Sequence, residues 1–298
     1  SLPQAIPGLG QMREFRFVSE GNARLRDFLR ARFSYTALKH MRQCAGAIRV
    51  NGRAVNVCER LNPGDVVEVS LPELCAPQAQ PEKLELRVVF EDGDLLIVSK
   101  GPGIACMVTN GHERDNLLSG LAYLYPGETF RVVTRLDRDT SGLVLVARNA
   151  YVHSCFSRDM HRIGRCYRAL CEGKIERDLT VSLPIARGED IRRIVSEAGK
   201  PAITHVHPVR AVGPNTLAEC TLETGRTHQI RVHMAAIGHP VVGDTLYGSG
   251  KGDYNTGQQL ECFRLEFLHP VTGQALKFEI SEQDTYLKDL LRAAEVEN

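Results

Sequence analysis

The chain has 298 residues, of which 43% are hydrophobic, and its 37 lysines and arginines nearly balance 36 aspartates and glutamates. This apolar content is enough for real cores, so a globally disordered chain is excluded, and the length predicts two domains or one large domain with an appendage. No apolar run approaches the roughly 18 residues that span a bilayer, and the first ten residues lack a signal-peptide pattern. We therefore expect a cytoplasmic protein without a membrane partner.

Positive charge is concentrated near the N-terminus of this nearly neutral chain. Residues 11–53 contain ten basic and three acidic residues, and nine of the ten basic residues are arginines. Arginine stays charged and can bind a phosphate through two parallel hydrogen bonds. A local basic block favours an anionic polymer as partner, and the alternative is a helix face whose charges are only solvated. The arginines that we assign to the expected RNA-binding surface are Arg24, Arg26, Arg42 and Arg49.

The first expected elements are two helices followed by a small sheet. Apolar residues recur at helical spacing over residues 22–45, and Ser34 could begin a second helix within this stretch. An Asn-Gly dipeptide between two alternating stretches predicts a hairpin over residues 47–55. Residues 72–81 contain three prolines and little periodicity, so we expect a linker there.

After the linker, many short strands are separated by a few helices. The strands that the sequence predicts cover residues 86–90, 95–98, 143–146, 166–171, 203–208 and 216–222. Asp115 and Asn149 could each cap a helix, and a third helix is expected over residues 227–237, ended by Gly238. This order predicts an α+β domain with a mixed, mainly antiparallel central sheet and flanking helices.

A polar turn precedes the predicted strand at residues 143–146. It places Asp137 directly after the apolar Leu136 and close to the cation of Arg135. A carboxylate at the mouth of a buried strand and beside cations stays ionised at neutral pH, which suits a nucleophile or a base better than an acid. The alternative is that these residues only form a turn, because aspartate, serine and glycine are common turn formers.

A second polar cluster lies at the start of the predicted helix over residues 227–237. Helical spacing brings Arg231 next to His228, and the helix N-terminus near Arg226 favours an anion. The alternative is an ordinary polar helix face. His228 and His233 are five residues apart, a poor spacing for zinc, and the nine cysteines are scattered without a Cys-x-x-Cys motif. Neither a metal site nor a disulfide framework is therefore expected.

One tyrosine stands out on the predicted strand at residues 166–171. Tyr167 lies on the opposite strand face from Arg168 and by itself is more typical of a core residue than of a ligand. The sequence contains no G-x-S-x-G, Walker A, G-x-G-x-x-G or H-E-x-x-H motif, so these common catalytic and nucleotide-binding templates do not apply. The pair Asp137 and Asp139 leaves a hydrolase as an alternative.

Three motifs share a pattern with a known family. The motifs are residues 135–142, Tyr167 with Ala169, and residues 225–233 continuing to 238–244. In combination they resemble the RluA-type family of RNA pseudouridine synthases over about residues 85–280. The resemblance implies the pseudouridine synthase fold, built on a mixed central sheet, and the isomerisation of uridine to pseudouridine in RNA without a metal or a coenzyme.

The resemblance also implies roles for individual residues. Asp137 matches the catalytic aspartate, and Arg231 matches the basic partner that holds it ionised. Tyr167 matches the tyrosine that stacks on the base and accepts the C5 proton. Arg135 matches the arginine that fills the gap left by the flipped nucleotide.

The sequence departs from the family pattern at two places. Thr134 stands where the family usually has histidine, and residues 100–103 read Lys-Gly-Pro-Gly instead of Lys-Pro-x-Gly. Since the residues matched to catalysis are all present, we expect these departures to affect the choice of substrate or the rate rather than the type of reaction. Arg226 and His228 of the third motif are expected to contact RNA.

The N-terminal residues resemble an S4-type RNA-binding domain, a common companion of this family. The matching stretches are residues 24–29, 48–52 and 61–67. We therefore expect an S4-like RNA-binding domain over residues 1–72, a linker over 73–84 and a catalytic domain over 85–298. The expected protein is a monomeric enzyme that modifies ribosomal or transfer RNA, and the alternative is a non-catalytic RNA-binding or ribosome-assembly protein.

Overall fold

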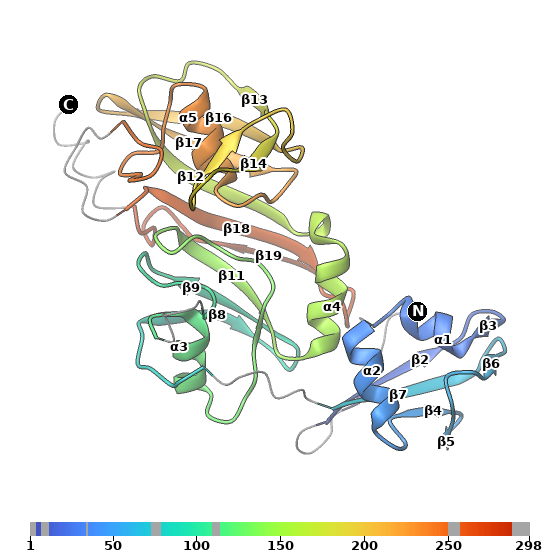
Figure 1. Ribbon diagram of the computed structural model, residues 1–298. Coiled ribbons are helices and arrows are strands. Elements are labelled where there is room, and N and C mark those ends of the chain that lie inside the picture. Colours follow the sequence, from blue (N-terminus) through green and yellow to red (C-terminus); the bar gives the residue numbers. More distant parts are fainter. Residues whose placement is uncertain are drawn as a thin grey trace.

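The computed structural model describes residues 4–6, 12–33, 35–72, 79–108, 114–249 and 257–287. Within these residues the strands form a five-stranded sheet near the N-terminus, a ten-stranded sheet in the rest of the chain and two small two-stranded sheets (Figure 1). We call the described residues up to 72 the N-terminal unit and those from 79 onward the C-terminal unit. Among the described helices, none has the length and apolar character needed to cross a membrane.

The N-terminal unit contains the two helices and the small sheet that its sequence predicts. Its helices are α1 (Leu25–Arg30) and α2 (Tyr35–Gln43), and Ser34, the expected start of the second helix, lies outside the described residues. Its strands are β1 (Gln4–Ile6), β2 (Met12–Val18), β3 (Ala23–Arg24), β4 (Ile48–Val50), β5 (Arg53–Ala54), β6 (Arg60–Leu61) and β7 (Val66–Pro72). The predicted hairpin is confirmed, because Asn51 and Gly52 connect β4 to β5 with φ angles of 49° and 78°, the left-handed pair that this tight turn requires.

An aromatic cluster joins the two units. Phe15 and Phe33 of the N-terminal unit lie with ring centroids 4.3 Å and 5.1 Å from the ring of Tyr151, which belongs to helix α4 (Ala150–Arg158) of the C-terminal unit. All three side chains are buried. The N-terminal unit is therefore packed directly against α4 (Figure 1).

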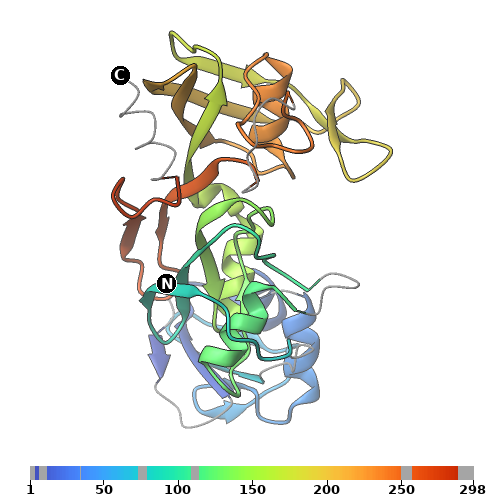
Figure 2. The same ribbon diagram turned by 90° about the vertical axis from the view of Figure 1, so that its left-hand side faces the viewer.

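The ten-stranded sheet is the framework of the C-terminal unit. In sheet order its strands are β13 (Leu179–Ser182), β16 (Ile203–Val212), β17 (Asn215–Leu222), β12 (Gly164–Glu172), β18 (Leu260–Leu268), β11 (Ser141–Ala147), β9 (Leu95–Lys100) and β8 (Leu86–Glu91), with β10 (Arg131–Val132) beside β11 and β19 (Ala275–Glu279) beside β18. Among these pairs only β11 and β18 run parallel, which confirms a mixed, mainly antiparallel sheet. A separate hairpin of β14 (Ile185–Arg187) and β15 (Arg193–Val195) projects from the unit (Figure 2, yellow).

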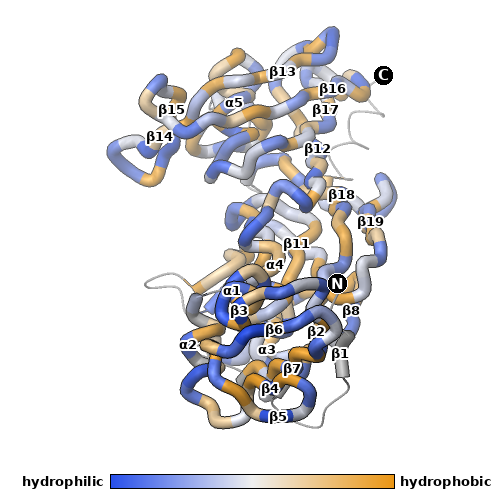
Figure 3. Tube along the Cα trace, turned by 90° about the vertical axis from the view of Figure 1, so that its right-hand side faces the viewer, coloured by the Kyte–Doolittle hydropathy of each residue, from blue (hydrophilic) through white to orange (hydrophobic). Residues whose placement is uncertain are grey.

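The middle of the ten-stranded sheet is the main hydrophobic core of the C-terminal unit. All seven residues of β11 and all six residues of β9 are buried, and Figure 3 shows hydrophobic residues along β11 and its neighbour β18. A strand that is covered on both faces has a continuous apolar sequence, which explains why the sequence predicted β11. The polar turn before β11 is therefore anchored to the buried middle of the sheet.

Two of the three predicted helix starts in the C-terminal unit differ from the structure. Asn149 caps α4 as predicted, and a short 3₁₀ helix follows at Met160–Arg162. Helix α3 (Leu117–Leu124) is capped by Asn116, so the prediction of Asp115 is wrong. Asp115 has a left-handed φ of 56°, whereas Asn116 is extended and its side chain accepts a hydrogen bond from the first turn of the helix.

Helix α5 (Gln229–Ala236) is shorter at its start than the predicted 227–237 helix. His228 has a left-handed φ of 58°, so residues 227 and 228 lie outside the helix. Gly238 follows the helix with a φ of 83°, which confirms the predicted C-terminal end. The residues around His228 therefore form a turn that leads into α5, and they are not arranged by helical spacing.

Candidate active site

Asp137 lies in the loop between β10 and β11, on the wall of an open cavity of about 1070 Å³. Tyr167 on β12 and Arg231 on α5 line the same cavity. The three residues that the sequence assigned to catalysis therefore meet in one place, although three separate motifs supply them. The volume is at the upper end of the range for small-molecule sites, which leaves room for a nucleoside and part of its backbone.

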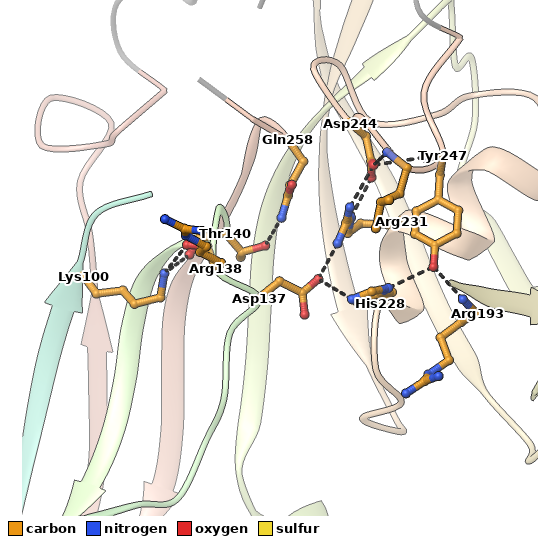
Figure 4. A network of polar contacts seen from close by, with 11 residues as sticks. Lys100, Asp137, Arg138, Thr140, Arg193, His228, Arg231, Asp244, Tyr247 and Gln258 are labelled. Atoms are coloured by element: carbon orange, nitrogen blue, oxygen red, sulfur yellow. Dashed lines mark hydrogen bonds and ion pairs between the residues drawn. The ribbon is translucent and has the colours of Figure 1, made fainter. Parts of the chain in front are cut away.

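Arg231 binds Asp137 and a second carboxylate at the same time (Figure 4). Its Nη1 donates a hydrogen bond of 2.9 Å to Oδ2 of Asp137, and its Nε and Nη2 donate bonds of 2.6 Å and 2.8 Å to Asp244. Burial alone would lower the pKa of Arg231, but the hydrogen bonds to Asp244 and the charges of both carboxylates outweigh it and raise that pKa. The guanidinium is therefore a fixed positive charge that orients the Asp137 carboxylate.

The backbone holds Asp244 in turn. Burial would raise the pKa of Asp244, but the hydrogen bonds and charge of Arg231, together with the amides of Leu246 and Tyr247, lower it. Those two amides donate to Oδ1 at 2.9 Å and 3.1 Å. Asp244 therefore remains ionised and balances the charge of Arg231 inside the protein, whereas the Asp137 carboxylate is one-quarter exposed and faces the cavity.

Lys100 holds the loop that carries Asp137 in place. It is the last residue of β9 and is fully buried, and its Nζ donates to the carbonyls of Gly101, Arg138 and Thr140 at 3.1 Å, 2.9 Å and 2.6 Å. An ammonium group has three hydrogen atoms to donate, and each has an acceptor here. Burial lowers the pKa of Lys100 to about 8. The lysine thus ties the end of β9 to the turn that directly follows Asp137.

Two further buried groups accept hydrogen bonds that shape the same loop. The amide of Leu145 donates to Oγ1 of Thr134 at 2.8 Å, and the amide of Leu136 donates to Sγ of Cys106 at 3.2 Å. Thr134, which replaces the histidine usual in the family pattern, is buried and forms part of the loop structure.

His228 lies beside Asp137 and not in the α5 helix (Figure 4). Its Nε2 is 3.8 Å from Oδ2 of Asp137, and its Nδ1 is 2.8 Å from the Tyr247 hydroxyl, which accepts a bond from the Arg193 amide. Burial and then the nearby guanidinium groups lower the pKa of His228, against the pull of Asp137. The ring is therefore neutral at pH 7. If Tyr247 donates to Nδ1, the ring proton is on Nε2 and faces Asp137.

Tyr167 lies in the wall of the cavity and is buried, with 7% of its surface exposed. Burial, reinforced by neighbouring groups that include the Asp137 carboxylate, raises its pKa well above the ordinary value. The side chain is therefore a neutral phenol at pH 7, whose ring presents an aromatic surface to a ligand.

The residues that were expected to contact RNA fall into two groups. Arg135, Arg226 and His228 line the cavity, with Arg135 exposed at its rim and the Nε of Arg226 bonded to the Pro201 carbonyl at 2.9 Å. The second group lies on the N-terminal unit, and its members are exposed and do not line this cavity: Arg24, Arg26, Arg42 and Arg49. The structure therefore does not bring the two groups together at one site.

Sequence reasoning missed several residues of the site. Asp244, Tyr247 and Lys100 received no role, although Asp244 ends the third motif. The only sequence signal for Asp244 was its place at the end of the third motif, which does not reveal its partner. The contribution of Lys100 could not be read from the sequence, because its acceptors are backbone carbonyls.

One group of side chains in the described residues has the spacing of metal ligands, and it lies outside this cavity. It consists of Asp92, Asp94 and His269. The amides of Val271 and Thr272 donate to Nδ1 of His269, and Asp92 faces its Nε2 at 3.0 Å. These contacts explain the cluster as a hydrogen-bonded corner of the fold.

Comparisons with known proteins agree with the geometry. Residues 94–236 match the family model for RNA pseudouridylate synthase. A Bacillus subtilis (strain 168) protein described as uncharacterized RNA pseudouridine synthase YlyB is 39% identical over 251 residues, which cover 78% of this chain and 81% of that protein. The ribosomal large subunit pseudouridine synthase D of Nitrosomonas europaea is 35% identical, with coverage of 78% and 72%.

Solved structures show the same relationship. Human RNA pseudouridylate synthase domain containing 1 superposes with a TM-score of 0.58 at 28% identity, covering 72% of this chain and 97% of that one. Together with the sequence relatives, this places the chain in the RNA pseudouridine synthase family. It is an enzyme that isomerises uridine to pseudouridine in RNA.

Proposed function

We propose that this enzyme modifies uridines in ribosomal RNA and that Asp137, Arg231 and Tyr167 form its catalytic site. The single observation that carries the site assignment is the Asp137 carboxylate, held by Arg231 on the same cavity that Tyr167 lines. Support for ribosomal RNA comes from relatives of 32–35% identity that are described as ribosomal large subunit pseudouridine synthase D. Transfer RNA is the other candidate substrate.

A uridine in folded RNA must leave its stack before it can enter this cavity. Extrusion costs a few kcal/mol, and a side chain that occupies the vacated space offsets part of that cost. Arg135 is exposed at the cavity rim, and its planar guanidinium can stack between bases. We assign it the role of filling the gap.

Asp137 then acts on the ribose. Both Arg231 and His228 face its Oδ2, and within the part of the chain that the structure describes no group donates to Oδ1. Oδ1 is therefore the oxygen available either to add to C1′ or to remove the 2′ proton. Either route needs an ionised carboxylate, which the fixed charge of Arg231 favours.

Tyr167 provides the surface on which the uracil turns. Its ring is buried in the cavity wall, where a base can stack on it. Because burial keeps the phenol neutral, its oxygen can accept the C5 proton only if it gives its own proton to another group at the same time. The enclosed wall also keeps the detached base from escaping into water.

The N-terminal unit is assigned to RNA docking, as an S4-like domain over residues 1–72 joined through residues 73–84 to a catalytic domain over 85–298. Its exposed arginines offer phosphate contacts that do not depend on sequence. Its packing against Tyr151 of α4 holds this arm at a fixed position relative to the cavity. We propose that the protein acts as a monomer.

The test is the release of tritium from a large-subunit ribosomal RNA transcript that carries [5-³H]uridine. Isomerisation breaks the C5–H bond, so the wild-type protein should release tritium and the Asp137→Asn variant should not. Release by both proteins would remove Asp137 from catalysis. Release from transfer RNA transcripts but not from ribosomal RNA would overturn the proposed substrate.

A further inference from the structure

Arg165 is a buried cation without a partner in the wall of the active-site cavity. It lies on β12 two residues before Tyr167, lines the same cavity and is 9% exposed. Its Nε is buried and has no hydrogen-bond acceptor. Within the described part of the chain, no carboxylate or carbonyl binds its guanidinium.

Other buried arginines of this protein are compensated. Arg168, on the same strand, donates to the carbonyl of Ile280 at 2.9 Å and lies 3.8 Å from Glu261. Arg231 has two carboxylates. A buried charge with no partner is strongly unfavourable, and a group in a binding site can satisfy this need through its ligand. The partner that Arg165 lacks is therefore expected on the substrate.

The surroundings of Arg165 place its charge next to the surface on which the base stacks. The guanidinium lies against the backbone of Gly225, where a Cβ atom would come within 2.5 Å of Nη1 and 3.3 Å of Cζ. Burial raises the pKa of the Tyr167 phenol, and the positive charge of Arg165 acts in the opposite direction and lowers it. Gly225 thus provides the space that keeps the cation beside Tyr167.

We propose that Arg165 donates a hydrogen bond to a carbonyl oxygen of the uracil and stabilises the negative charge that the base acquires when it leaves the ribose. This inference rests on the proposed function. When the C1′–N1 bond breaks, its electron pair stays on the base and spreads over N1 and the two carbonyl oxygens. A preorganised donor at such an oxygen acts where charge develops.

The charge is then consumed in the second half of the reaction. The base rotates, its electron pair forms the C1′–C5 bond, and the C5 proton is lost while N1 gains one. No oxidant or cofactor is needed, and the product is an isomer of the substrate. The role of Arg165 is the same whether Asp137 adds to C1′ or removes the 2′ proton, because the base leaves with the electron pair in both routes.

The first experiment measures the rate of single-turnover tritium release at a saturating concentration of the ribosomal transcript. It compares Arg165→Met and Arg165→Lys with the wild type. We expect Arg165→Met to lose about 100-fold in rate while its affinity for the transcript stays within about threefold, and Arg165→Lys to retain part of the rate. The matched control is Arg177→Met, which removes an exposed arginine outside the cavity and should be unaffected.

The second experiment replaces the target uridine with 5-fluorouridine. Because its C5 has no proton to lose, the C1′–C5 bond forms with the fluorine retained and water adds at C6 and N1, and this rearranged nucleoside is followed by chromatography. Fluorine itself stabilises negative charge on the base, so the loss caused by Arg165→Met should shrink to about tenfold. An equal loss with both bases would overturn the proposal. An unchanged rate with weaker RNA binding and a smaller salt dependence would instead identify a phosphate contact, which also overturns it.

Gly225→Ala gives an independent test, because the added methyl group must displace the flexible end of Arg165. We expect a loss in rate similar to that of Arg165→Met and little further loss in the double variant. Additive losses would contradict the proposal. Thermal unfolding of each variant checks that the fold is retained. If the wild type releases no tritium, the proposed function fails, whereas normal turnover by the Arg165 variants rejects this inference alone.

Discussion

Nη1 of Arg231 lies 2.9 Å from Oδ2 of Asp137, although 94 residues separate them in the sequence. The loop before β11 carries the carboxylate, and the first turn of α5 carries the guanidinium. The remaining nitrogens of Arg231 bind Asp244, so the arginine cannot turn away from Asp137 without breaking a buried ion pair. This geometry gives the Asp137 carboxylate one defined orientation toward the cavity.

Replacing Arg231 should damage both catalysis and stability. Arg231→Met leaves the carboxylate of Asp244, which is fully buried, without its cation. We expect loss of tritium release and a decrease of about 3 kcal/mol in the free energy of unfolding, measured by denaturant titration. Asp137→Asn is the control, since it should abolish turnover with a change below about 1 kcal/mol. A stable Arg231→Met protein would contradict the structural role of the ion pair.

Lys100 should make the activity sensitive to alkaline pH. Its pKa is about 8, so above that pH the neutral amine has only two hydrogens for three carbonyl acceptors and the Asp137 loop loosens. We expect the single-turnover rate to decline above pH 8. Lys100→Met should already be slower at pH 7, on the order of 100-fold, and its rate should not show this alkaline decline. A wild-type profile that stays flat to pH 9.5 would refute the assignment.

The lowered pKa of Lys100 also predicts that the stability of the fold increases with pH, whereas the rate decreases. The folded pKa lies below the ordinary value of 10.5, so between these values the unfolded chain binds more protons than the folded chain. The contribution of Lys100 to stability therefore rises with pH over that window. Thermal unfolding of the wild type and of Lys100→Met from pH 7.5 to 10 separates this contribution from those of other groups.

His228 should make the fold sensitive to acid. Burial lowers its pKa below the ordinary 6.5, so as the pH falls below 6.5 the unfolded chain takes up a proton that the folded chain resists, and stability is lost. His228→Gln keeps a polar group next to Tyr247 but cannot titrate. We expect its melting temperature to decrease less than that of the wild type between pH 7 and pH 5, and an identical decrease would show that His228 does not contribute.

The arginines of the N-terminal unit should control the salt dependence of RNA binding. We expect the triple variant Arg26→Gln, Arg42→Gln and Arg49→Gln to lower the slope of log affinity against log salt concentration by about 2 to 3. Tritium release at saturating RNA should be retained. Substitution is preferable to deletion of the unit, because deletion would expose Tyr151, which packs on Phe15.

The matched control for this experiment neutralises exposed cations of the C-terminal unit. Lys174→Gln with Arg177→Gln removes two positive charges outside the cavity and should leave the slope unchanged. An equal effect of the two sets would mean that overall charge, and not a docking surface on the N-terminal unit, governs the salt dependence.

Local chemistry made much of the fold predictable. The hairpin at Asn51 and Gly52 was predicted correctly because a left-handed turn restricts the residue types that can form it. The buried strand β11 was predicted because a strand covered on both faces must be apolar throughout. The starts of α3 and α5 were missed, because Asp115 and His228 adopt left-handed conformations that residue type and spacing do not predict.

Residue type and spacing predicted the α+β class and several strands and helices, but not the hairpin of β14 and β15 or the strands β18 and β19. The reaction family and the choice of Asp137, Tyr167 and Arg231 came from the resemblance of three motifs to a known family. The partners of the buried charges became known only from the folded chain: Asp244 binds Arg231, Lys100 supports the loop through backbone carbonyls, and Arg165 has no partner among the described residues. Compensation of a buried charge depends on which groups lie within a few ångströms, and chain folding sets those distances independently of separation along the sequence.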